Sequence, residues 1–200
     1  MPPDALKNSH LSASNSFDVV VVGGGHAGCE AALAASRMDC TTLLLTLSLE
    51  KIALMPCNPA VGGVGKGQLT REIDALGGEQ GRNTDRSFIQ MKLLNTGKGP
   101  AVRALRAQTD KKLYEDNMKR VLVSEPKLKV LEGKVAAINV SRETINGVTL
   151  TDGSVINALA VILACGTFLK ANIVVGDNKF PAGRMGEAPA NELSLSLIAA

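Results

Sequence analysis

A glycine-rich turn follows a run of β-branched residues, Val19 to Val22, near the start of the chain. The spacing Gly-x-Gly-x-x-Gly between a strand and a helix is typical of dinucleotide binding, because glycines allow a tight turn and a close approach of pyrophosphate to the backbone. The positive end of the following helix attracts the phosphates. A purely structural glycine turn is the alternative. The residues expected to bind the dinucleotide here are Gly23, Gly24, Gly25, His26, Ala27 and Gly28.

Two further places are expected to contact the same cofactor. No Asp or Glu ends the second strand to bind a ribose hydroxyl, and Thr46 or Ser48 occupies that region instead. We expect Thr46 to make this contact, with simple solvation of its hydroxyl as the alternative. Gly166 and Thr167 follow another apolar strand, and open α/β sheets place ligands at the carboxyl ends of their strands. Close packing of small residues against a helix explains them nearly as well.

A cysteine in a proline-fixed loop is the candidate for covalent chemistry. Cys57 lies between Pro56 and Pro59, and a run of glycines with Lys66 follows. Backbone amides and a lysine are able to lower a thiol pKa, so Cys57 is the candidate catalytic residue; an inert buried cysteine is the alternative. The same loop does not match a Walker A motif, because Ala60 and Gly67 replace its first Gly and its Ser/Thr, which disfavours a nucleotide triphosphatase.

A basic turn is the candidate anion site. Lys98, Arg103 and Arg106 lie near the start of a predicted long helix, where cations oppose the helix dipole and therefore suggest a nearby anion. A solvated charged face is the alternative.

The elements that position these residues predict an α/β fold of Rossmann type. Phe17 to Thr46 reads as a strand, a helix and a second parallel strand, and Ala158 to Ala164 as another buried parallel strand. The helices predicted between them are Gln68 to Leu76 and the longer Ala101 to Val123. A small antiparallel β-meander is predicted from Lys129 to Leu131, Val135 to Val140 and Val148 to Leu150.

Composition sets the broad class. The chain has 200 residues, 45% of them hydrophobic, and a formal charge of +3, so it is long enough for one globular domain and only mildly basic. Its four cysteines are scattered, which argues against a metal site and for a reducing compartment. Residues 1–16 are polar and predict a disordered tail before an FAD-binding domain over 17–200. The sequence shows no targeting signal and no apolar run of membrane-spanning length, so we expect a cytoplasmic protein with no membrane contact.

Three longer motifs closely resemble the GidA/MnmG family, in the same order along the chain. They are Val22 to Ala32, Cys57 to Gly67 and Glu72 to Gly78, and the resemblance extends through Lys98 to Gln108 and Gly166 to Leu169. The resemblance implies a flavoenzyme that, with the GTPase MnmE, forms 5-carboxymethylaminomethyl or aminomethyl uridine at the tRNA wobble position. It implies FAD as cofactor, NADH and methylene-tetrahydrofolate as co-substrates, a homodimer, a catalytic Cys57, and contacts of Lys98, Arg103 and Arg106 with tRNA phosphates or cofactor.

The resemblance also shows departures. Pro56 stands where the family commonly has a small hydroxyl residue, and family members are much longer than this chain. The implied fold is therefore incomplete relative to the family, without the rest of the FAD domain, the NADH-binding domain and the C-terminal helices used for tRNA and MnmE. A truncated, catalytically silent FAD-binding or interaction module is the alternative function. A related folate-dependent tRNA methyltransferase fits less well, because of the Cys57-Asn58-Pro59 loop.

Overall fold

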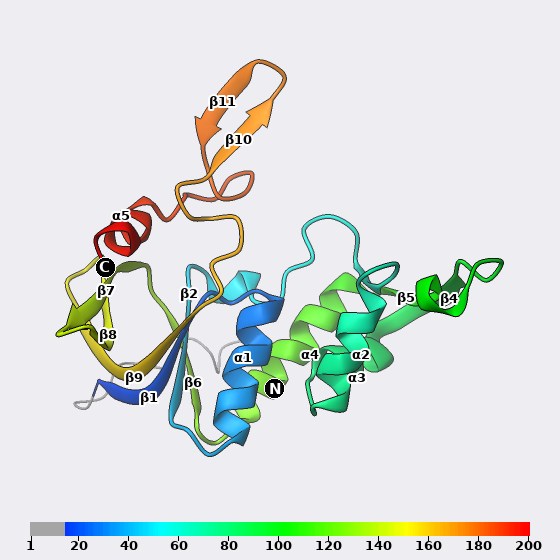
Figure 1. The fold of residues 1–200 in the computed structure, drawn as a ribbon, viewed down its shortest axis with the longest axis horizontal. Helices are drawn as coiled ribbons and strands as arrows, with labels where there is room; N and C mark the ends of the chain where they lie inside the picture. Colours follow the sequence, from blue (N-terminus) through cyan, green and yellow to red (C-terminus); the bar gives the residue numbers. More distant parts are fainter. Residues whose placement is uncertain (1–14) are drawn as a thin grey trace.

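A six-stranded mixed sheet forms the centre of the protein, whose computed structural model describes residues 15–200 (Figure 1). The strands are β1 (Ser16–Val22), β2 (Thr42–Thr46), β6 (Leu128–Glu132), β7 (Val135–Ser141), β8 (Thr144–Leu150) and β9 (Val155–Leu163). Their order is β6-β2-β1-β9-β8-β7. The first four in this order run parallel, and β8 pairs antiparallel with both β9 and β7. The α/β fold, with a parallel sheet and a small antiparallel β-meander, is as the sequence predicts.

The predicted strand–helix–strand unit is present at the centre of this sheet. The helix α1 (His26–Arg37) connects β1 to the parallel β2. Successive strand residues alternate between the two faces: Val21 and Leu44 pack in the cluster that holds the α1 side chains, and Val20 and Leu43 pack in a cluster on the other face. Both strands are therefore buried on both sides, which explains their continuous apolar sequences.

Helices pack on the two faces of the sheet. On one face α4 (Lys111–Ser124) packs beside α1, and its Tyr114, Met118 and Leu122 join the first cluster (Figure 1). On the other face α5 (Asn191–Ala199) packs against β7, and Leu193 joins the second cluster.

A smaller unit lies between β2 and β6 in the sequence. Its antiparallel sheet has the order β3-β5-β4 and extends away from the large sheet (Figure 1). The predicted helix over Gln68–Leu76 is confirmed as α2, which ends before Gly77. The elements of this unit are the 3₁₀ turn η2 (Leu49–Lys51), β3 (Ala60–Gly62), α2 (Gly67–Ala75), α3 (Gln80–Ser87), β4 (Phe88–Leu94), the 3₁₀ turn η3 (Pro100–Val102) and β5 (Ala104–Thr109).

The predicted helix over Ala101–Val123 is wrong in its first half. That segment forms η3 and β5, and the helix α4 begins only at Lys111. Asp110 caps α4, because its carboxylate accepts a hydrogen bond from the backbone N–H of Leu113 at 2.9 Å. Pairing of β5 with strands on both of its sides decides its conformation, whatever the helical spacing of its apolar residues.

The membership of the predicted meander is also corrected. Lys129 to Leu131 belongs to β6, which pairs parallel with β2 at the opposite edge of the sheet, so the meander consists of β7, β8 and β9. Gly133 does not make a hairpin turn between β6 and β7. Its backbone N–H donates to the carbonyl of Thr46 at 2.9 Å, and the chain then crosses to the other edge.

The last part of the chain includes a hairpin, β10 (Asn172–Val175) and β11 (Asn178–Pro181), which projects from the sheet before α5 (Figure 1). Residues 1–14 of the predicted tail over 1–16 lie outside the described residues, and Ser16 already belongs to β1. Among residues 15–200, the structure has no helix of the length and apolar character needed to span a membrane.

Candidate functional site: a cavity at the carboxyl ends of the parallel strands

A cavity of about 300 Å³ opens where β1, β2 and β9 end. The residues that line it come from three stretches of the sequence, 22–56, 133–135 and 164–193, and most are small or apolar. They include Val22, Gly23, Gly24, Gly25, His26, Leu45, Thr46, Leu47, Ser48, Lys51, Leu54, Pro56, Gly133, Lys134, Val135, Ala164, Cys165, Gly166, Thr167, Phe168, Arg184, Glu187, Ala190 and Leu193. The cavity therefore lies where open α/β sheets bind their ligands.

The glycine turn forms one wall, and two of its glycines are required by close contacts. Gly23 has φ +121°, and a Cβ there would overlap the carbonyl oxygen of Ala164. A Cβ at Gly28 would overlap the carbonyl oxygen of Gly23, so Gly28 lets α1 begin close to β1. A Cβ at Gly25 would have no neighbouring atom within 4 Å. The turn thus presents bare backbone toward the cavity at Gly25.

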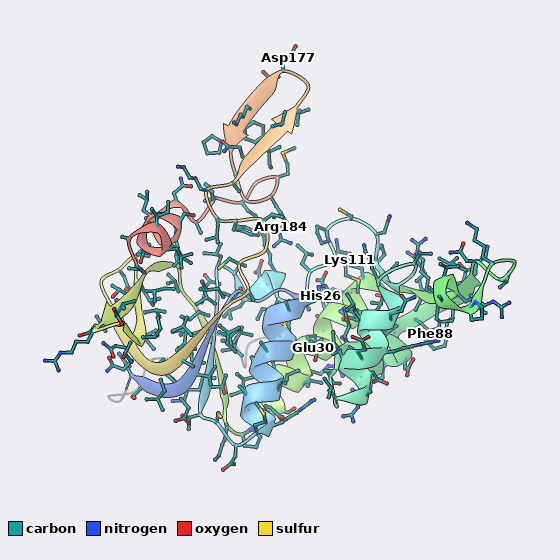
Figure 2. All side chains as sticks on the ribbon, viewed as in Figure 1. His26, Glu30, Phe88, Lys111, Asp177 and Arg184 are labelled. Carbon is teal, nitrogen blue, oxygen red and sulfur yellow. The ribbon has the colours of Figure 1, made fainter. Side chains whose placement is uncertain are left out.

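The N-terminus of α1 faces this region without a side-chain cap. Gly25 is the N-cap residue and offers no side chain to the first backbone N–H groups. His26 begins the helix, lines the cavity and has its ring 5.6 Å from that of Tyr114 (Figure 2 labels His26). Burial lowers the pKa of His26, which favours the neutral imidazole. The helix end therefore offers unpaired N–H donors to an anion.

The other sequence-predicted cofactor residues divide into two groups. Thr46, Gly166 and Thr167 line the cavity, whereas Ala27 and Gly28 do not. The hydroxyl of Thr46 donates to the carbonyl of Ser48 at 3.2 Å, and that of Thr167 donates to the carbonyl of Gly183 at 3.1 Å.

Charged residues that sequence reasoning missed complete the rim of the cavity. Lys51 and Arg184 both contact Glu187: Lys51 Nζ lies 3.4 Å from Glu187 Oε2, and Arg184 Nε lies 3.0 Å from Glu187 Oε1. Arg184 also lies over the ring of Phe168, with its guanidinium carbon 5.1 Å from the ring centroid. The glycines at 183 and 186 mark a turn in the sequence, but nothing local indicates that this turn reaches the cavity.

The cysteines occupy different environments. Cys57 is exposed; it is not among the residues that line the cavity, although the adjacent Pro56 is. Cys29 is buried, and burial raises its pKa to about 12, so its thiol stays protonated. Cys165 lines the cavity and is half-buried, and burial raises its pKa as well.

The basic residues Lys98, Arg103 and Arg106 are exposed on β5 and on the connection between β4 and β5, away from the cavity. Arg103 Nε donates to the carbonyl of Lys98 at 3.2 Å. The predicted position at a helix N-terminus is therefore wrong, because η3 and β5 replace the start of that helix.

This arrangement suits binding of an elongated anionic molecule. Bare backbone at Gly25 and free N–H groups at the start of α1 match a pyrophosphate, and the apolar walls match flat rings. The ring of His26 lies against the ring of Tyr114, an aromatic neighbour that does not accept a proton from it. The lining of the cavity therefore fits the binding of a ligand better than it fits proton transfer by an acid–base pair.

Comparison with known proteins identifies close relatives. The family described as glucose inhibited division protein A matches residues 18–200. The tRNA uridine 5-carboxymethylaminomethyl modification enzyme MnmG of Alkaliphilus oremlandii is 54% identical over 183 residues, which are 92% of this chain and 29% of that protein. The enzyme of the same name from Geobacillus thermodenitrificans is 51% identical over 179 residues, 90% of this chain and 28% of that protein. The chain thus spans less than a third of the length of these relatives.

Solved structures give a matching result. GidA of Aquifex aeolicus superimposes with a TM-score of 0.89 at 45% identity, covering 94% of this chain and 31% of that chain. The GidA-related protein of Thermus thermophilus has a TM-score of 0.66 at 20% identity, over 92% of this chain and 68% of that one. PqsL of Pseudomonas aeruginosa, described as "a probable FAD-dependent monooxygenase", has a TM-score of 0.51 at 15% identity, covering 73% of this chain and 41% of that chain. The last two similarities show a shared fold.

Proposed function

The chain belongs to the glucose inhibited division protein A family, and on this basis we propose that its cavity binds FAD as part of a tRNA uridine modification enzyme. The observation that carries the proposal is the bare-backbone turn at Gly25 and the uncapped start of α1 at the edge of the cavity. A pyrophosphate placed there accepts hydrogen bonds from backbone N–H groups and meets the positive end of the helix.

Each group of cavity residues has a part in this proposal. Gly23, Gly24, Gly25 and His26 hold the pyrophosphate through the backbone, with Ala27 and Gly28 fixing the first turn of α1. Thr46, Gly166 and Thr167 contact the remainder of the cofactor. When bound, FAD supplies redox chemistry, while the protein orients it and excludes water.

The specific reaction that we propose is the one implied by the resemblance to the family. We propose formation of 5-carboxymethylaminomethyl or aminomethyl uridine at the wobble position, with the GTPase MnmE as partner, NADH as reductant and methylene-tetrahydrofolate as one-carbon donor. A homodimer in the cytoplasm belongs to the same proposal. The names of relatives that act on tRNA uridine support the tRNA part.

Cys57 is proposed as the catalytic thiol. Its side chain is exposed and follows Pro56, which lines the cavity, so the thiol lies next to the proposed FAD site but in reach of a second substrate. The two other cysteines with altered pKa values are poorer nucleophiles, because burial keeps Cys29 and Cys165 protonated.

The β4–β5 hairpin is proposed as a contact for tRNA phosphates. Residues 87–109 contain Lys92, Lys98, Arg103 and Arg106 and no Asp or Glu. Lys98, Arg103 and Arg106 are exposed. Lys92 on β4 lies opposite Arg106 on β5 in the register of the two strands. Phosphate contacts of this kind position an RNA without reading its sequence.

Flavin binding is the first test. The purified 200-residue chain is expected to carry FAD, seen as flavin absorption, or to take it up on reconstitution, seen as quenching of flavin fluorescence. A colourless chain that does not bind added FAD would contradict the cavity assignment.

Modification is the second test. Nucleoside mass spectrometry of tRNA from a strain lacking the family enzyme shows whether this chain restores the modified uridine. Flavin binding without restored modification would favour the alternative, a catalytically silent FAD-binding or interaction module.

A further inference from the structure

We propose that Glu187 is the carboxylate that binds the hydroxyls of the adenosine ribose, in place of the acidic residue that dinucleotide-binding folds usually carry at the end of the second strand. This proposal rests on the proposed FAD site. In this chain β2 ends in Thr46, whose hydroxyl already donates to the carbonyl of Ser48. Of the residues that line the cavity within 15–200, Glu187 is the one carboxylate.

Glu187 lies near the region where that acid is needed. Lys51, in the 3₁₀ turn that follows β2, has its ammonium 3.4 Å from Glu187 Oε2. The side chain of Glu187 is only 11% exposed, so the carboxylate is held at the cavity wall. A segment far away in the sequence therefore brings a negative charge into contact with the turn that follows β2.

The turn that carries Glu187 is firmly anchored. The N–H of Glu187 donates to the carbonyl of Arg184, and the N–H of Gly183 donates to the carbonyl of Glu187, both at 2.9 Å. Thr167, in the cavity wall, donates to the carbonyl of Gly183. Figure 2 shows Arg184 on this turn, below the β10–β11 hairpin. These bonds preorganise the carboxylate before any ligand arrives.

The neighbouring cations orient Glu187 without using all of its acceptor capacity. A carboxylate has about four acceptor positions. Arg184 Nη2 donates to Oε2 at 3.4 Å, whereas Arg184 Nε lies 3.0 Å from Oε1 without donating a hydrogen bond to it. Acceptor positions therefore remain for two ribose hydroxyls.

The test compares FAD with an analogue whose adenosine ribose lacks the 2′- and 3′-hydroxyls. Dissociation constants are measured by flavin fluorescence with the 200-residue chain. The wild-type chain is expected to bind FAD about tenfold or more tightly than the analogue, because hydrogen bonds to a charged group are strong. Glu187→Gln is expected to reduce this preference about fivefold, and Glu187→Met, which has no strong acceptor, to abolish it.

Glu192→Gln is the matched control. Glu192 is also paired with a lysine that lines the cavity, Lys134, at 2.7 Å, but does not line the cavity itself. The control is expected to keep the wild-type preference, and circular dichroism checks that each variant is folded.

The outcomes separate the two proposals. Equal binding of FAD and analogue by the wild-type chain, or an unchanged preference in both Glu187 variants, would overturn the role of Glu187 while leaving the FAD site intact. Failure of the wild-type chain to bind FAD at all would overturn both proposals.

Discussion

The carboxylate of Glu30, on α1, accepts hydrogen bonds from the backbone N–H of Glu79, which lies 3.0 Å from each of its oxygens. It also accepts from the N–H of Gln80, the first residue of α3. Glu30 thus caps a helix about fifty residues later in the sequence. The side chain of Glu79 continues the connection, because it forms ion pairs with Arg37 of α1 and Arg86 of α3.

Removing the charge of Glu30 is expected to destabilise the protein. Glu30→Gln leaves one oxygen in place of two and weakens the cap of α3, so the free energy of unfolding should fall by about 1 to 2 kcal/mol. Urea unfolding measures the change. Glu72→Gln, on the exposed surface of α2, is the control and should change little. Equal stability of the two variants would mean that the cap contributes nothing.

Asp18 is expected to make stability depend on pH. Its carboxylate accepts hydrogen bonds from the hydroxyl and the backbone N–H of Thr41, both at 2.7 Å, and these lower its pKa below the usual 3.8. A lowered folded-state pKa means that the stabilisation is present above 3.8 and is lost as the pH falls through the folded value. Asp18→Asn should therefore be less stable than wild type at neutral pH, with the difference shrinking in acid.

Unfolding by urea at neutral and acidic pH measures this difference. Asp177→Asn, at the exposed tip of the β10–β11 hairpin (Figure 2), is the matched control and should leave the free energy of unfolding close to that of the wild-type chain. A gap for Asp18→Asn that stays constant into acid would contradict the assignment.

Valine at two glycines of the turn should separate binding from folding. Gly25→Val places a side chain in open space at the cavity wall, so the chain is expected to fold normally but to lose FAD. Gly28→Val forces a side chain into the carbonyl of Gly23, so α1 cannot pack on β1 and the melting temperature should fall sharply. Circular dichroism and flavin absorption measure the two effects. Normal flavin content in Gly25→Val would refute the placement of the pyrophosphate.

The cysteines should react with iodoacetamide in a defined order. Cys57 is exposed and should be alkylated first, whereas Cys29 is buried with its pKa raised to about 12 and should react only after unfolding. Cys165 lines the cavity and should be protected by added FAD. Peptide mass spectrometry after timed labelling gives the order. Labelling of Cys165 at the same rate with and without bound FAD would mean that the cofactor lies elsewhere.

Local sequence patterns predict the side of the cavity formed by the glycine turn and α1, and they do not predict the side formed by the turn that carries Glu187. The strand ending at Val22, the glycine turn and α1 are adjacent in sequence, and their conformations are dictated by β-branched residues and by contacts within the turn. The helical reading of Ala101–Val123 failed because β5 is stabilised by strands from elsewhere in the chain. The Asp110 cap marks the true start of α4. Glu187 had no local signal, since its place at the cavity depends on Lys51 and on the packing of its turn.

The walls of the cavity come from segments that are neighbours only in the folded state. The thiol of Cys165 donates to the carbonyl of Val22, 143 residues earlier in the chain. A ligand that touches both segments closes a loop of that length, and it binds a chain in which the loop is already closed far better than one in which it is open. Cofactor loading then acts as a cooperative step of folding, so the segments around Val22 and Cys165 should gain protection from hydrogen exchange together.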